Sequence, residues 1–150
     1  MINLDNRVSM IYEYLLNVVK LGPEEIRMLK IAISHIHEVS PVDKPLIFKK
    51  LDDLNSASED LSWLILVLKR HLSKVKHDIA DIKSPAFTAL VRQGRPSTVA
   101  IEHEIRFSNK ELPDLEDKEE TLKNILEYVQ HVQKCLDDYS WTMRDKLKSE

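Results

Sequence analysis

The chain has 150 residues, of which 31% are charged, and its formal net charge is −3. Two glycines and six prolines are too few for a turn-rich protein, so the composition favours an all-α fold in one domain. The single cysteine excludes an internal disulfide and indicates a reducing compartment. No apolar run approaches the roughly 18 residues of a membrane span, and charges interrupt the N-terminus. We therefore expect a cytoplasmic protein without a signal peptide.

The first part of the chain, residues 1–54, predicts a helical hairpin. Apolar residues recur at helical steps over 4–21 and again over 23–39, and Gly22 separates the two patterns. The prolines that follow should stop the second helix, because the residue before proline is disfavoured in the α region. Residues 46–54 are expected to form a short helix or an irregular connection.

Two longer apolar patterns predict an antiparallel pair of helices over about 58–92 and 109–148. Capping-box spacing at Ser56 and Ser108 marks the two predicted starts, and Gly94 is placed to cap the end of the first helix. The expected fold is a long helical hairpin with the N-terminal hairpin packed on it or on a partner. In the second helix, apolar residues recur every seven: Leu115, Leu122, Val129, Leu136 and Met143.

The segment 61–68 is nearly apolar on all sides, so something must cover it. The N-terminal hairpin is one candidate and another copy of the chain is the other, and the two are compatible. We expect the chain to form a homo-oligomer, and the residues expected at its interface are the following: Trp63, Leu64, Leu66, Leu122, Val129, Leu136 and Met143.

Chemistry-bearing motifs are missing from the sequence. The six histidines lack the spacing of metal ligands, and there is no Cys-x-x-Cys or His-Glu-x-x-His. Cys135 falls on a long helix, and no serine sits in a nucleophile turn. Gly22 and Gly94 are the only glycines, which excludes a phosphate-binding glycine loop. We expect no enzyme activity, no cofactor, no metal and no small-molecule substrate.

Positive charge gathers in the middle of the chain. Residues 61–110 carry nine Lys and Arg against four Asp and Glu, whereas the flanking parts are acidic. Cations neutralise phosphates and aromatic rings stack on unpaired bases, so with Phe87 and Phe107 nearby this set favours single-stranded nucleic acid. The acidic run 114–120 could instead neutralise Lys83, but it would not reach the cations further back. The predicted binding residues are the following: Lys69, Arg70, Lys74, Lys76, Arg92, Arg95, Arg106 and Lys110.

Part of the chain, within residues 61–150, resembles the UvsY-type phage recombination mediators. The resemblance lies in the run Arg92-x-Gly94-x-x-Ser97-x-x-Ala100-Ile101-Glu102-x-x-Ile105-Arg106 and in Trp141-Thr142-Met143-Arg144. It implies an all-α protomer of a ring-shaped assembly in a phage-infected cell. Such a protein binds single-stranded DNA and helps load a recombinase onto strands covered by single-strand-binding protein. The resemblance implies that the stretch of basic residues before the family's glycine-containing turn corresponds to Arg92, Gln93, Gly94 and Arg95.

The alternative function is a structural or adaptor protein, such as a phage assembly or scaffolding component, whose helices make protein contacts only. The discriminating feature is the turn near Gly94, because an adaptor has no need of Arg92, Arg95 and Arg106 together around an exposed turn. No groove-reading helix is present, so binding without sequence preference is expected.

Overall fold

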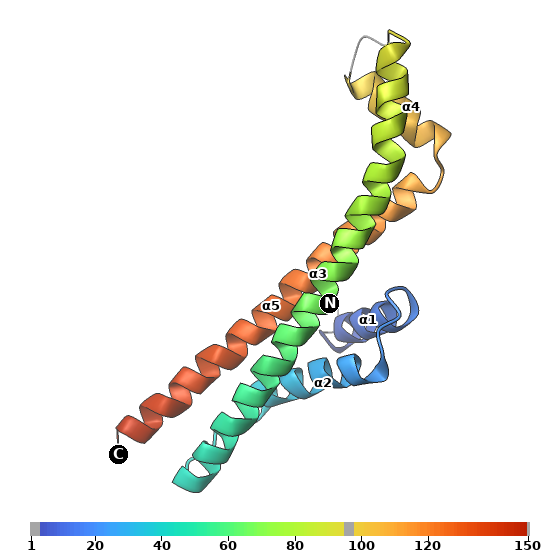
Figure 1. Cartoon of the computed structure of the whole chain (residues 1–150). Coiled ribbons are helices and arrows are strands. Elements are labelled where there is room, and N and C mark those ends of the chain that lie inside the picture. Colours follow the sequence, from blue (N-terminus) through green and yellow to red (C-terminus); the bar gives the residue numbers. More distant parts are fainter. Residues whose placement is uncertain (1–3, 95–97, 150) are drawn as a thin grey trace. The chain divides into compact units, whose positions relative to one another are not determined.

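The computed structural model describes residues 4–94 and 98–149, with side chains from Arg7 onward. These residues form five helices and no strand, which confirms the all-α prediction (Figure 1). No helix in the described part of the chain is long and apolar enough to cross a membrane. The helices are α1 (Leu4–Asn17), α2 (Pro23–His37), α3 (Lys44–Arg92), α4 (Thr98–Ser108) and α5 (Leu112–Lys148).

The first two helices match the prediction in number, but α1 ends earlier than expected. Lys20 takes a left-handed conformation, with φ of 59°, and the Leu21 N–H donates to the Leu15 carbonyl at 2.9 Å. This bond across the helix end satisfies a free carbonyl and stops the helix before Gly22. Gly22 then caps α2, and Pro23 occupies its first turn, where the missing N–H costs nothing.

The third helix corrects the predicted start near residue 58. α3 is one helix of 49 residues that begins at Lys44, with the Asp43 carbonyl accepting the Ile47 N–H at 2.9 Å. Pro45 was expected to stop a helix, but it lies in the first turn of α3, where proline is tolerated. The capping-box serine, Ser56, is an exposed residue inside the helix. The expected boundary between the N-terminal hairpin and the long hairpin therefore falls within α3.

The turn that follows α3 at Gly94, the distal turn, lies where it was predicted. α3 continues past Pro85 to Arg92, and Gly94 has a φ of 77° with its N–H on the Val91 carbonyl at 3.0 Å, which confirms the glycine cap. α5 begins at Leu112, later than the predicted 109. The reason is local, because Ser108 still belongs to α4 and the Leu112 N–H closes a turn on the Asn109 carbonyl at 3.2 Å.

The chain contacts divide into two units, and the first comprises Met1–Val67 and Ile125–Glu150. In this unit α3 and α5 lie antiparallel and are linked by polar side chains. Ser58 Oγ donates to Asp137 Oδ1 at 3.0 Å, and Gln133 Nε2 donates to the Ser58 carbonyl at 2.9 Å. The largest completely buried side chains of this unit come from four helices: Leu15, Leu29, Ile47, Leu54, Leu61, Leu64, Val129, Leu136 and Met143.

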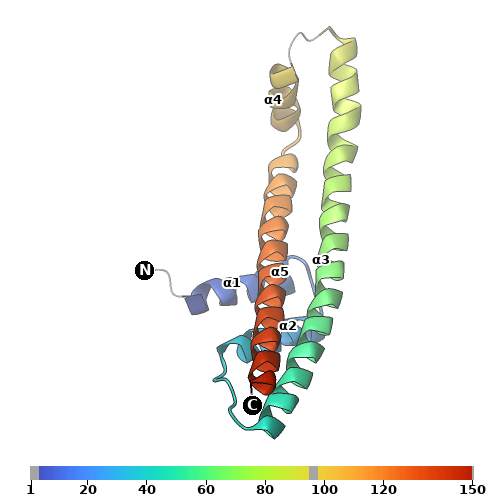
Figure 2. The same ribbon diagram turned by 90° about the vertical axis from the view of Figure 1, so that its left-hand side faces the viewer.

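The second unit, Leu68–Asn124, contains the end of α3, all of α4 and the start of α5 (Figure 2). Its interior includes Leu112, which was not predicted and is completely buried. Leu115, the predicted first member of the sevenfold pattern, is only half-buried. The side chains of this core are the following: Leu68, Leu72, Val75, Ile79, Ile101, Ile105, Leu112 and Leu122.

Candidate nucleic-acid interface

Four cations of the second unit form one exposed stretch of α3, the basic segment, residues 69–76. Leu68, Leu72 and Val75 turn inward and are at most 8% exposed. A helix that buries one stripe presents the intervening positions to solvent. The four cations that occupy those positions are all exposed: Lys69, Arg70, Lys74 and Lys76.

Within the part of the chain that the structure describes, no carboxylate forms an ion pair with the basic segment. No acidic residue occurs between Asp60 and Asp78. None of the four cations forms an ion pair with any residue that the structure describes. Exposed and unpaired cations that share one helix surface add their fields, which suits them to a polyanion.

His71 lies beside the basic segment and reports its positive field. Burial lowers the pKa of this half-buried imidazole, and the positive charges of Lys118 and Lys74 lower it further. Lys118 was among neither the predicted nucleic-acid-binding residues nor the predicted interface residues, although it interrupts the apolar pattern of the last helix. That interruption is the signal in the sequence that could have identified it. The structure therefore brings a cation of α5 close to the basic segment.

Two predicted residues near the distal turn remain exposed. Arg92 is the last residue of α3, and the negative end of the helix dipole stabilises its positive charge. Lys110 is exposed in the turn between α4 and α5 and has no ion pair within the described ranges. Arg95 lies outside the described residues, so the structure does not place this predicted contact.

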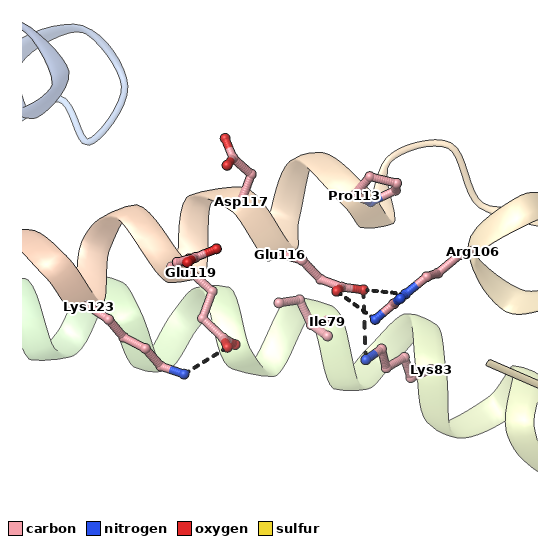
Figure 3. Close-up of a pocket in the computed structure, with 9 residues that line it drawn as sticks. Ile79, Lys83, Arg106, Pro113, Glu116, Asp117, Glu119 and Lys123 are labelled. Atoms are coloured by element: carbon pink, nitrogen blue, oxygen red, sulfur yellow. Dashed lines mark hydrogen bonds and ion pairs between the residues drawn. The ribbon is translucent and has the colours of Figure 1, made fainter. Parts of the chain in front are cut away.

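Arg106 differs from the other predicted cations because it already holds a carboxylate. Its Nε and Nη2 donate to Glu116 Oε1 and Oε2 at 3.3 and 3.0 Å, and Lys83 Nζ lies 3.8 Å from Glu116 Oε1 (Figure 3). The prediction that the acidic run neutralises Lys83 is thus confirmed, with Glu116 as the partner. Arg106 and Lys83 are therefore less available to a phosphate than the cations that have no carboxylate partner.

These pairs line a groove of about 650 Å³ between the helices of the second unit. Lys123 pairs there with Glu119 at 3.1 Å, and four carboxylates face three cations. The excess of carboxylates disfavours an anion in this groove. No group of three or more potential metal-ligating side chains occurs within the part of the chain that the structure describes. We therefore place the candidate interface on the basic segment and not in this groove.

Seven residues were predicted at an oligomer interface, and the structure divides them. Five are at most 1% exposed within the single chain and belong to its core: Leu64, Leu122, Val129, Leu136 and Met143. Because the chain's own helices already cover these five side chains, they have no surface to offer a second copy. Trp63 and Leu66 are 49% and 42% exposed. The expectation of an apolar contact surface therefore narrows to these two residues.

A polar cluster in the first unit was missed entirely. Lys50 is 6% exposed, and its Nζ pairs with the Glu38 carboxylate, donates to the His35 carbonyl at 3.1 Å and lies 5.2 Å from the Tyr139 ring centroid. The Tyr139 hydroxyl donates to the Glu38 carbonyl at 3.3 Å. Lys50 thus satisfies the end of α2 and lowers the pKa of Glu38 through its hydrogen bond. This is the role of a structural cation.

Cys135, the only thiol, is half-buried on α5 with its Sγ 3.6 Å from His131 Nε2 one turn away. The pair lies within one helix and does not line the groove at Glu116.

Comparison of the chain with protein-family models, with curated proteins and with solved structures finds no match.

Proposed function

We propose that this chain is a non-enzymatic protein that binds single-stranded DNA through the basic segment of α3, with Arg92, Arg95 and Lys110 as further contacts. The observation that carries the proposal is that the four exposed cations of residues 69–76 have no ion-pair partner among the residues that the structure describes. A phosphate backbone supplies the missing negative charge at regular intervals. Affinity from such contacts depends on charge and not on base sequence.

The recombination role rests on the resemblance of the segments 92–106 and 141–144 to the UvsY-type mediators. Under this proposal the protein acts as an accessory that assists a recombinase on strands covered by single-strand-binding protein. It assembles as a homo-oligomer, and the half-exposed Trp63 and Leu66 support this part of the proposal. Light scattering tests it. A mass near the 17.5 kDa of one chain would contradict self-association.

The test of DNA binding is fluorescence anisotropy with a labelled single strand at several salt concentrations. Alanine replaces all four cations of the basic segment in one variant. A matched variant removes the same number of charges from exposed lysines of the first unit: Lys44, Lys49, Lys134 and Lys148. If four phosphate contacts are lost, the negative slope of log K against log salt should become shallower by about 3 in the first variant only.

A protein adaptor is the second candidate function, and one observation favours it. Val99 and Phe107, on the solvent side of α4, are 66% and 89% exposed. Apolar side chains that remain this exposed are suited to a protein contact. Absence of DNA binding at low salt, or equal loss in both charge variants, would favour this function over DNA binding.

A further inference from the structure

A second groove of the second unit lies between the distal part of α3 and α4, close to the predicted DNA-binding turn. Its volume is about 310 Å³, at the small end of the roughly 300–1,000 Å³ of small-molecule sites. The six residues that line it combine an aromatic ring, an aliphatic wall and four polar groups: Lys83, Ser84, Phe87, Thr88, Glu102 and Ile105.

The apolar part of this groove offers a flat surface. Phe87 is 37% exposed and lines the groove from α3, whereas Ile105 is 3% exposed and closes it from α4. A half-exposed ring beside a buried aliphatic side chain can cover one face of a planar group. Aromatic side chains in single-strand-binding proteins hold bases in this manner.

Lys83 supplies a hydrogen-bond donor to the polar part of the groove, and Thr88 and Glu102 supply acceptors. Thr88 Oγ1 donates to the Ser84 carbonyl at 3.0 Å, so its hydroxyl proton is engaged and its lone pairs remain available. Glu102 is exposed and has no ion pair among the residues that the structure describes. A free carboxylate would repel a phosphate but accepts hydrogen bonds from an amino group. Cytosine, adenine and guanine carry such a group, and thymine does not.

We infer that this groove holds one unstacked base of the bound strand, with the face of the base on Phe87 and an exocyclic amino group on Glu102. The inference rests on the proposed function, because the basic segment supplies the attraction for the phosphates. It adds a contact that the phosphates cannot provide. The strand should therefore bind through charge along α3 and through one stacked base at the α3–α4 groove.

The test compares two labelled single strands of equal length and equal phosphate number, one of cytidines and one with abasic sites in place of the bases. We expect the wild-type protein to bind the base-bearing strand more tightly, by between about fivefold and about 140-fold, the range that stacking of one base supports. Phe87→Leu keeps the apolar volume and removes the ring. Its affinity for the cytidine strand should fall towards the abasic level with an unchanged salt slope.

Three matched variants separate stacking from folding and from hydrogen bonding. Phe48→Leu changes a phenylalanine of the first unit, which is 58% exposed and does not line the groove, and should leave both affinities unchanged. Phe87→Tyr keeps a ring and should keep the preference. Glu102→Gln should reduce the expected preference of the wild type for cytidines over thymidines.

The outcomes distinguish the two proposals. Equal binding of the base-bearing and abasic strands by the wild-type protein would overturn the base-binding groove and leave phosphate binding intact. Absence of binding to either strand at low salt would overturn both. Loss of affinity for both strands in Phe87→Leu, with an altered circular dichroism spectrum, would show a folding role for the ring. The wild-type comparison then decides the inference without that variant.

Discussion

The two units use lysine in opposite ways. In the first unit, Lys50 is 6% exposed and its ammonium group is held by a carboxylate, a carbonyl and an aromatic ring. In the second unit, Lys69 and Lys74 are exposed and have no ion pair among the described residues. The difference teaches that a lysine with satisfied donors stabilises the fold, whereas a group of lysines without partners is available to an external anion.

Arg106 and Lys83 lie between these extremes. They are 48% and 36% exposed at the side chain, and both contact the same carboxylate, Glu116. Exposed ion pairs of this kind contribute little to stability, about 0–1 kcal/mol. Their main consequence is electrostatic, because Glu116 offsets the positive charge of Arg106 and Lys83.

The largest expected effect is on stability and comes from Lys50→Met. The substitution keeps a side chain of similar length but removes the Lys50 donor from the Glu38 carboxylate and the His35 carbonyl, so we expect the free energy of unfolding to fall by about 2 kcal/mol. Urea unfolding followed by circular dichroism measures this. Lys49→Met, at the exposed neighbouring position, should stay within about 0.5 kcal/mol. Equal losses in the two variants would contradict the structural role of Lys50.

The next effect is on DNA affinity and comes from Glu116→Gln. Removal of this carboxylate frees Arg106 and Lys83 for phosphates, so binding should tighten several-fold at low salt and the salt slope should steepen by about 0.7 for each new contact. The matched control is Asp117→Asn, which removes one charge from an exposed neighbour that has no ion pair among the described side chains. If the control tightens binding equally, only net charge matters and the pairing is irrelevant.

A smaller effect concerns the titration of His71, measured by NMR. Its pKa should lie below the ordinary value of about 6.5, because burial and the charges of Lys118 and Lys74 disfavour the imidazolium. The unfolded chain then binds the proton more readily, so this group makes stability decrease as pH falls below about 6.5. Bound phosphates should raise the pKa towards its ordinary value. A pKa that does not move when DNA is added would separate His71 from the interface.

The smallest effect is the pH dependence of the Glu38–Lys50 pair. The hydrogen bond from Lys50 holds the pKa of Glu38 below its ordinary value. The stability from this shift is present above the ordinary pKa of about 4.3 and is lost as pH falls through the lowered pKa. Because Glu38 is half-exposed, the change is small. The difference in unfolding free energy between wild type and Glu38→Gln, measured from pH 6 to pH 3, should shrink towards the acid end. A constant difference would contradict the pKa shift.

Most apolar positions and the starts of α1 and α2 could be predicted, but the starts of α3 and α5 could not. The Ser-x-x-Glu spacing at Ser56 matched a capping box, yet Ser56 is an exposed residue inside α3, so this spacing does not by itself mark a helix start. Pro45 could either stop a helix or occupy its first turn, and the neighbouring residues do not distinguish the two. Gly94 was predicted correctly because a left-handed cap strongly favours glycine.

The sequence by itself determined the helices of this protein, the burial of Leu122, Val129, Leu136 and Met143, and the exposure of the basic segment. These follow from the period of the α-helix and from the run without acidic residues, both of which are local properties. Only the tertiary structure decided which charges meet. It brought Glu116 to Arg106 and Lys83, enclosed Lys50 beside Glu38, and formed the groove at Phe87. Pairing of charges depends on the approach of helices that are distant in the chain, and a helical pattern does not specify that approach.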